Sequence, residues 1–233
     1  MLEISNVKYK NILKGISFKV KAGEITGIVG KNGSGKSTLL KAISGFLKYS
    51  GEIILNGKEI KNLPGSERIK KINLLPQEFP VSSLTVKEIL ETTAKLTQTS
   101  LKKIDRTIEK YNLKKQKHQS LSTLSGGEKV RLFLARLEII DPKVVLLDEP
   151  SAFLDVVVLK EFKSFVLKMK RLRKIVIIVS NDLNFILNTA DSIVGIKEGK
   201  IVPSTGVTEQ FLTSVYDCPV KIVKINKRQQ VLI

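Results

Sequence analysis

Short alternating and apolar segments divide the first part of the chain into strands and a helix. Residues 2–9 and 12–20 alternate apolar and polar positions, which predicts two strands joined as an antiparallel ribbon. Residues 24–30 form an apolar run that leads into a glycine-rich turn and then a helical pattern over 37–44. A strand, a loop and a helix therefore open the central part of the domain.

Further along, the period of the pattern changes twice. Between about 85 and 118, apolar residues recur at helical spacing among lysines and acids, which predicts a small all-helical insert. Apolar strands then alternate with helical segments, as is typical of a parallel α/β domain. Strands are expected at 51–55, 71–75, 143–147, 174–179, 192–197, 220–225 and 230–233, and helices at 156–170, 182–190 and 208–216. Turns are expected at Asn56-Gly57 and Pro64-Gly65.

The length of 233 residues fits one large α/β domain with a small subdomain. The longest apolar run, 175–179, is far shorter than the roughly 20 residues that cross a bilayer. The first residues enter a strand pattern without an apolar leader, so we expect a cytoplasmic protein. The one cysteine, Cys218, excludes an internal disulfide and gives no zinc-binding pattern.

The chain is strongly basic. It has 40 Lys and Arg residues against 22 Asp and Glu residues, a formal net charge of +18. Such a charge attracts nucleic acid or the anionic inner surface of a membrane, and it also arises on an ordinary solvated surface. The lysines are spread along the whole chain, and no strand interleaves aromatic with basic residues as RNA-binding strands do. We therefore favour a solvated or membrane-near surface and expect no nucleic-acid partner.

The strongest chemical signal is a phosphate-binding loop. A complete G-x-x-x-x-G-K-S motif follows the strand predicted at 24–30 and opens the helix predicted at 37–44. In that context, backbone N–H groups and the positive end of the helix point at the phosphates of a nucleotide. Lys36 supplies charge to the β- and γ-phosphates, and the Ser37 hydroxyl can ligate Mg²⁺. The predicted ATP-binding residues of the loop are Gly30, Lys31, Asn32, Gly33, Ser34, Gly35, Lys36, Ser37 and Thr38.

A second signal is an apolar strand that ends in two carboxylates. Residues 144–147 are Val-Val-Leu-Leu, and Asp148 and Glu149 follow directly. On its own, this pattern is more typical of a solvated turn. Beside a phosphate loop it predicts a Walker B element, in which Asp148 holds Mg²⁺ through its water shell and Glu149 polarises the attacking water as general base.

A third motif, Leu-Ser-Gly-Gly-Glu at 124–128, is typical of a helix start with Ser125 as N-cap. Its adjacent glycines also leave bare backbone at the helix N-terminus for an anion. With this motif beside the other two, the chain resembles the ATP-binding-cassette (ABC) ATPase family over nearly its whole length. The resemblance implies that Ser125, Gly126, Gly127 and Glu128 of one subunit close over the ATP held by another.

The resemblance also assigns roles outside these three motifs. Tyr9 stands where the family has an aromatic ring that stacks on adenine, and Gln77 matches the Q-loop glutamine that senses Mg²⁺ and the γ-phosphate. Asp155 matches the D-loop residue that connects the two active sites. Where the family has a switch histidine after the last core strand, this chain has Asn181, and its one histidine, His118, lies in the helical insert. Because an amide cannot take up a proton or carry charge, we expect slow hydrolysis with ATP binding and dimer closure retained.

These patterns together predict a P-loop NTPase core, mainly a parallel sheet with flanking helices, an N-terminal antiparallel β ribbon and a small helical subdomain. We expect 1–76 and 126–233 to form the core with its β subdomain, and 77–125 to form the Q-loop and helical subdomain. The resemblance implies ATP and Mg²⁺ as cofactors and a second cassette, identical or different, as partner. The expected catalytic residues are Gln77, Glu149 and Asn181, and the expected Mg²⁺ ligands are Ser37, Gln77 and Asp148.

The family contains transport and non-transport members. Residues 211–220 resemble the end of importers for iron-siderophore complexes, haem and cobalamin. We therefore expect an ATP-driven import subunit that works on the cytoplasmic face of the membrane beside separate transmembrane permease subunits. A soluble ABC ATPase acting in protein or cluster assembly is the alternative and stays open at this point. A simple P-loop kinase does not explain the motif at 124–128.

Overall fold

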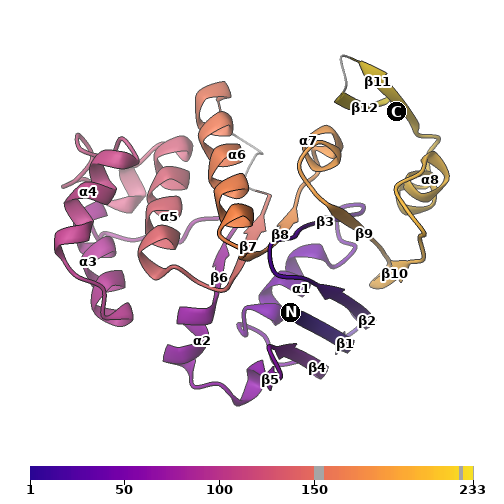
Figure 1. The fold of residues 1–233 in the computed structure, drawn as a ribbon, viewed down its shortest axis with the longest axis horizontal. Helices are drawn as coiled ribbons and strands as arrows, with labels where there is room; N and C mark the ends of the chain where they lie inside the picture. The colour runs from indigo at the N-terminus through magenta and orange to yellow at the C-terminus, as the bar shows by residue number, and fades with distance from the viewer. Residues whose placement is uncertain (150–154, 226–227, 233) are drawn as a thin grey trace.

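A six-stranded sheet with the order β10-β9-β3-β8-β7-β6 runs through the middle of the molecule (Figure 1). The computed structural model describes residues 1–149, 155–225 and 228–232. The strands are β3 (Ile25–Val29), β6 (Ile72–Leu75), β7 (Val144–Asp148), β8 (Ile175–Val179), β9 (Ser192–Lys197) and β10 (Lys200–Val202). Every neighbouring pair is parallel except β9 with β10. The carboxyl ends of β3, β6, β7 and β8 therefore meet at one edge, where open parallel sheets bind their ligands.

Both faces of this sheet are buried, which explains the unbroken apolar runs of its strands. In β7, Val145 and Leu147 face one core, whereas Val144 and Leu146 face the other. The first core contains apolar residues of the helices α3 (Val86–Thr97), α4 (Lys102–Lys110), α5 (Gly126–Ile140), α6 (Val156–Arg171), α7 (Leu183–Leu187) and α8 (Glu209–Tyr216). The second core contains α1 (Lys36–Ile43) and the N-terminal strands.

The N-terminal strands form a separate antiparallel sheet with the order β2-β1-β4-β5. Its members are β1 (Leu2–Tyr9), β2 (Leu13–Val20), β4 (Ser50–Leu55) and β5 (Lys58–Glu59). Leu2 and Ile4 of β1 are buried against α1 and the central sheet, while Glu3 between them is partly exposed. The predicted antiparallel ribbon is confirmed, and β4 pairs with the other edge of β1.

The helices α3, α4 and α5 gather at one end of the molecule, on the left of Figure 1. Helix α3 begins with a capping box, in which Thr85 and Glu88 each bond the other's backbone N–H. Helix α5 lies between the sheet on one side and α3 and α4 on the other, and it is buried on most of its sides. Its long apolar run is therefore explained by contacts with helices and sheet together.

The last part of the chain returns to the central sheet and then leaves it. Helix α8 packs on β9, and the hairpin of β11 (Lys221–Ile225) and β12 (Arg228–Leu232) contacts α7. Asn184 of α7 bonds the backbone of β12 at Val231, and Asn188, the C-cap of α7, bonds it at Gln229. Within the described ranges, no helix combines the length and the apolar character needed to cross a bilayer.

Most predicted strands and helices are confirmed to within two residues. Helix α7 ends at Leu187, earlier than expected. The helix α2 (Gly65–Lys71) was not predicted, because Pro64-Gly65 is typical of a turn; Pro64 instead stands at the N-cap of this helix. The predicted turn at Asn56-Gly57 is confirmed and joins β4 to β5, with both residues at positive φ.

Candidate nucleotide-binding and hydrolysis site

The phosphate loop connects the end of β3 to the start of α1. Gly33 and Gly35 have φ values of 78° and 106°, in the left-handed region that favours glycine. A Cβ on Gly33 would meet no atom within 4 Å, so this part of the loop faces open space. The Ser34 Oγ is buried and has no hydrogen-bond partner among the described residues. Open backbone and an unpartnered hydroxyl beside a helix start fit a bound phosphate chain.

Lys36 is tied to the loop that it follows. Its Nζ donates to the carbonyl oxygens of Gly30 and Lys31, at 2.8 and 3.1 Å. Lys36 is only 5% exposed, and burial lowers the pKa of its ammonium group, against the attraction of Glu149 and Asp148. A positive charge is therefore held inside the curve of the loop, where it can meet phosphate oxygens.

Ser37 and Asp148 face each other across the base of the site. The Ser37 hydroxyl donates to Asp148 Oδ1 at 2.9 Å, and Asp148 is 2% exposed at the end of β7. Burial raises the pKa of Asp148, and the hydrogen bond from Ser37 opposes that rise. A hydroxyl and a buried carboxylate are oxygen ligands of the kind that Mg²⁺ takes, so the donor set fits this ion.

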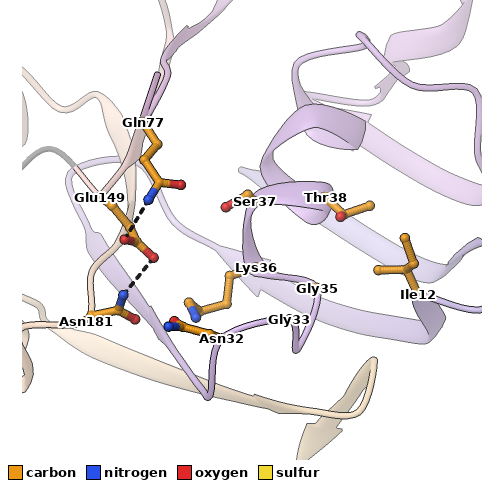
Figure 2. A pocket seen from close by; sticks show the side chains of 10 residues that line it. All are labelled: Ile12, Asn32, Gly33, Gly35, Lys36, Ser37, Thr38, Gln77, Glu149 and Asn181. Carbon is orange, nitrogen blue, oxygen red and sulfur yellow. Dashed lines mark hydrogen bonds between the residues drawn. The ribbon is translucent and has the colours of Figure 1, made fainter. Parts of the chain in front are cut away.

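Glu149 is held from two sides (Figure 2). Gln77 Nε2 donates to Glu149 Oε2, and Asn181 Nδ2 donates to Glu149 Oε1, each at 3.0 Å. Gln77 follows β6 and Asn181 follows β8, so the parallel strands bring these distant residues together. Glu149 itself has a φ of 46° and donates its backbone N–H to Val179 at 2.9 Å, which turns its side chain out of the β7 direction.

Most of these residues line one pocket of about 370 Å³, and Asp148 lies behind it, bonded to Ser37. Its lining residues are Ile12, Asn32, Gly33, Gly35, Lys36, Ser37, Thr38, Gln77, Glu149 and Asn181. Ile12 was not anticipated from the sequence; it lies in the turn between β1 and β2, where the only local signal is an apolar residue in a polar turn. Most of the predicted nucleotide-binding and catalytic positions thus line the same pocket, at the carboxyl edge of the sheet.

Four predicted nucleotide contacts, Tyr9, Gly30, Lys31 and Ser34, do not line the pocket. The Tyr9 ring packs partly against the second core and does not line the pocket, although the backbone of Ile12 bonds the Tyr9 carbonyl at 3.0 Å. The Lys31 side chain forms an ion pair with Asp217 at 3.0 Å, and the Lys31 carbonyl accepts from Lys36.

The signature residues lie at the start of α5 and do not line the pocket. Ser125 caps the helix in a capping box with Glu128, whose carboxylate accepts from both Ser125 N and Ser125 Oγ at 2.8 Å. A Cβ on Gly126 would meet no atom within 4 Å. The start of α5 is therefore a capped helix N-terminus with open space, among the described residues, beside Gly126.

Asp155 is the described member of the predicted D-loop. Its carboxylate accepts from the N–H of Val158 at 2.8 Å and caps α6. The remaining D-loop residues, 151–154, lie outside the described residues.

The sequence was compared with known proteins. It matches the ABC transporter family over residues 13–152. It is 32% identical to the petrobactin import ATP-binding protein of Bacillus subtilis, over 98% of each chain. It is 32% identical to the hemin import ATP-binding protein of Bartonella henselae, over 93% of this chain and 88% of that protein. Two other relatives, both putative ABC transporter ATP-binding proteins, are longer, and the chain spans 54% and 39% of their lengths.

The fold also resembles solved structures of ABC transporter subunits. The fold superimposes on a nucleotide-free ATP-binding cassette from an ABC transporter with a TM-score of 0.76, at 26% identity, over 92% of this chain and 94% of that one. In this chain the phosphate loop precedes α1, the capped glycine pair begins α5, and Asp148 and Glu149 stand at the end of β7. The chain therefore belongs to the ABC transporter family of ATP-binding cassettes.

Proposed function

We propose that this chain binds Mg-ATP and hydrolyses it as the ATP-binding subunit of an ABC transporter. One observation carries the proposal: a single pocket is lined by residues of the phosphate loop, by Ser37, whose hydroxyl bonds the buried Asp148, and by Glu149, which Gln77 and Asn181 hold. The carboxylate lies beside the loop that would hold the phosphates, which is the arrangement that attack by water on a γ-phosphate requires.

Different residues in and around the pocket would bind the phosphates, the Mg²⁺ ion and the adenine of ATP. The N–H groups of the loop and the Lys36 ammonium would bind the β- and γ-phosphate oxygens. Ser37 and Asp148, with the Gln77 amide oxygen, would hold Mg²⁺, which neutralises charge on those phosphates when bound. Ile12 and Thr38 line the opposite side of the pocket, and Tyr9 would reach adenine by moving its ring toward Ile12.

Glu149 is the proposed general base. Each of its oxygens accepts one hydrogen bond, from Gln77 or Asn181, and each keeps a lone pair with which to accept a proton from water. Asn181 contributes a neutral donor in place of a group that can become charged. We therefore propose that hydrolysis in this chain is slow while ATP binding is retained.

The site needs a second cassette. Ser125, Gly126, Gly127 and Glu128 form an open helix N-terminus that does not line the pocket of their own chain, which supports their use over ATP held by a partner subunit. Asp155, the last residue of the predicted D-loop, caps the start of α6. We propose that 77–125 is the helical subdomain and that 1–76 and 126–233 form the core.

Transport is the proposed task of the assembled protein. The 32% identical relatives whose names state petrobactin and hemin import are matched over most of their lengths, and this supports import of an iron-siderophore, haem or cobalamin type substrate. The proposed partners are transmembrane permease subunits and a second cassette, at the cytoplasmic face of the membrane, and no nucleic acid. The alternative is a non-transport ATPase in protein or cluster assembly. Co-purification with a polytopic membrane protein supports transport, whereas nuclease-sensitive association with ribosomes at moderate salt supports the alternative.

Replacement of Lys36 tests the nucleotide site. In Lys36→Ala, the phosphates lose the buried ammonium group beside the loop, so we expect Mg-ATP affinity to fall by about 100-fold, as for a charged hydrogen bond of about 3 kcal/mol. Titration of ATP against the parental protein and the variant measures this. Lys95→Ala, which removes an exposed lysine of α3, is the matched control and should bind ATP as the parent does. Equal affinity in Lys36→Ala would overturn the assignment of the loop.

A further inference from the structure

The C-terminal helix α8 lies directly on the strand that neighbours β3. A Cβ built on Gly195 of β9 would lie 2.5 Å from Val215 Cγ2 and 2.8 Å from Phe211 Cζ. The glycine therefore lets the helix approach the β9 backbone closely. Phe211, Leu212 and Val215 are buried in the first core, so the position of α8 is fixed by packing.

The end of this helix contacts the phosphate loop through two side chains. The N–H of Gly30, the first residue of the loop, donates to the Tyr216 hydroxyl at 3.3 Å. Asp217, in the left-handed conformation that ends α8, accepts from Lys31 at 3.0 Å and also pairs with Lys197 of β9. Consecutive residues of the tail thus hold consecutive residues of the loop.

The same two loop residues hold Lys36 on their other side. Their carbonyl oxygens accept both hydrogen bonds of the Lys36 ammonium. Gly30 donates its N–H to Tyr216 and accepts at its carbonyl from Lys36. The tyrosine therefore helps to fix the position of Gly30, and through it the position of the Lys36 ammonium group. A Cβ on Gly30 would lie 2.2 Å from the Ile196 oxygen, so the loop also lies against the β9 backbone.

We propose that Tyr216 is a positioning residue that holds the phosphate loop in its nucleotide-binding conformation, with the Lys31–Asp217 pair beside it. The inference rests on the proposed ATP function and deepens it. Tyr216 does not line the pocket, so it acts through Gly30 and Lys36 rather than on the nucleotide. Burial raises the pKa of Tyr216, so its hydroxyl stays protonated and neutral at physiological pH.

Tyr216→Phe is the direct test, because it removes the hydroxyl and keeps the packed ring. We expect the KM and the Kd for Mg-ATP to rise about five-fold, the factor that one ordinary hydrogen bond supplies, with kcat unchanged within about two-fold. Backbone amide exchange over 30–36 should become faster in the variant. Tyr111→Phe is the matched control, since its hydroxyl also has one partner, Glu138, and lies on a different part of the fold.

The outcomes are distinguishable. If the parental protein does not bind Mg-ATP, the proposed function fails and the inference fails with it. If the parent binds, and Tyr216→Phe binds equally well with unchanged amide exchange, only the inference fails. A lower melting temperature with unchanged KM, kcat and loop exchange would show a packing role alone and would also overturn it. A raised KM and faster loop exchange in Tyr216→Phe, with neither in Tyr111→Phe, supports it.

Discussion

At the scale of single residues, Asn181 is the position where this site departs most from the pattern that its family resemblance implies. The structure shows what the asparagine does in its place: its amide donates to Glu149, opposite the amide of Gln77. Two neutral donors thus orient the carboxylate. Neither can become positively charged as negative charge redistributes in the transition state, and an imidazole can.

We therefore expect Asn181→His to raise the steady-state ATPase rate by about ten-fold, if about 1.4 kcal/mol of transition-state stabilisation is gained. Affinity for ATP should change much less, because the phosphate loop is untouched. Asn181→Ala, which only removes the hydrogen bond to Glu149, should be slower than the parent. Hydrolysis rate and nucleotide affinity are measured for all three proteins. A histidine variant that is equal to or slower than the parent would show that the site works with asparagine.

Some residues of the candidate site could be proposed from the sequence and others could not. Lys36, Asp148 and Glu149 belong to short motifs whose chemistry depends on neighbouring residues, so local pattern was enough to propose them. Ile12 and Tyr216 reach the pocket or the loop from distant segments. Their positions depend on the packing of β2 and α8 against the core, and nothing in their local sequence records it.

At the scale of elements, predictability follows burial. The strands β3, β7 and β8 are buried along their whole length, and their continuous apolar runs made them easy to predict. Helix α2 has no buried residue, so it has no apolar stripe to reveal it, and its Pro-Gly start has the composition of a turn. Surface helices of this kind depend on charge pairs such as Lys71 with Glu67, which periodicity does not detect.

The three helices α4, α5 and α6 are joined by one carboxylate. Glu138 of α5 accepts from Lys110 and Tyr111 at 2.6 Å and from Lys168 of α6 at 3.2 Å, and its side chain is 17% exposed. Burial alone would raise the pKa of Glu138, but these hydrogen bonds outweigh it and lower the pKa to about 2. The lowered pKa means that the folded protein is stabilised when Glu138 is ionised.

Because the folded pKa lies below the unfolded one, this contribution is complete above about pH 4.5 and is lost as the pH falls toward 2. We expect Glu138→Gln to lower the free energy of unfolding by about 2 kcal/mol at pH 7. This difference between parent and variant should become smaller below about pH 4.5. Urea denaturation of parent and variant between pH 7 and 3 measures it. Glu109→Gln, at an exposed position of α4, is the control. If the difference in free energy of unfolding between parent and variant does not depend on pH, the ionised form of Glu138 is not what joins the helices.

At the scale of the whole molecule, the two surfaces proposed to contact ATP lie apart in the chain's own fold. The phosphate loop opens at the carboxyl edge of the central sheet, whereas the open N-terminus of α5 lies outside that pocket. An ATP bound at the loop would expose γ-phosphate charge that no described residue of the signature contacts. Two chains related by a two-fold axis can satisfy both halves at once, since an isologous pair presents each loop to the other's helix.

Glu149→Gln should stabilise that pair. The amide keeps the size of the carboxylate but cannot accept the proton from water, so bound ATP persists and the closed dimer accumulates. We expect size-exclusion chromatography to show a dimer with ATP and a monomer without it, and a hydrolysis rate reduced at least about 100-fold, as for loss of a general base. Hydrolysis at the parental rate would show that Glu149 is not the base.

A second substitution in the Glu149→Gln background decides whether α5 forms the other half of the site. Gly126→Asp places a carboxylate at the open helix start, where a Cβ meets no atom within 4 Å, so the fold should tolerate it. Like charges repel, so the carboxylate would oppose the partner's γ-phosphate and abolish the ATP-dependent dimer. Gly206→Asp adds the same charge at another glycine whose Cβ would be in open space, and it should leave the dimer intact. If the dimer survives Gly126→Asp, the partner's ATP does not lie at this helix. Both variants change the net charge equally, so loss of the dimer in both would show that the added charge alone is responsible.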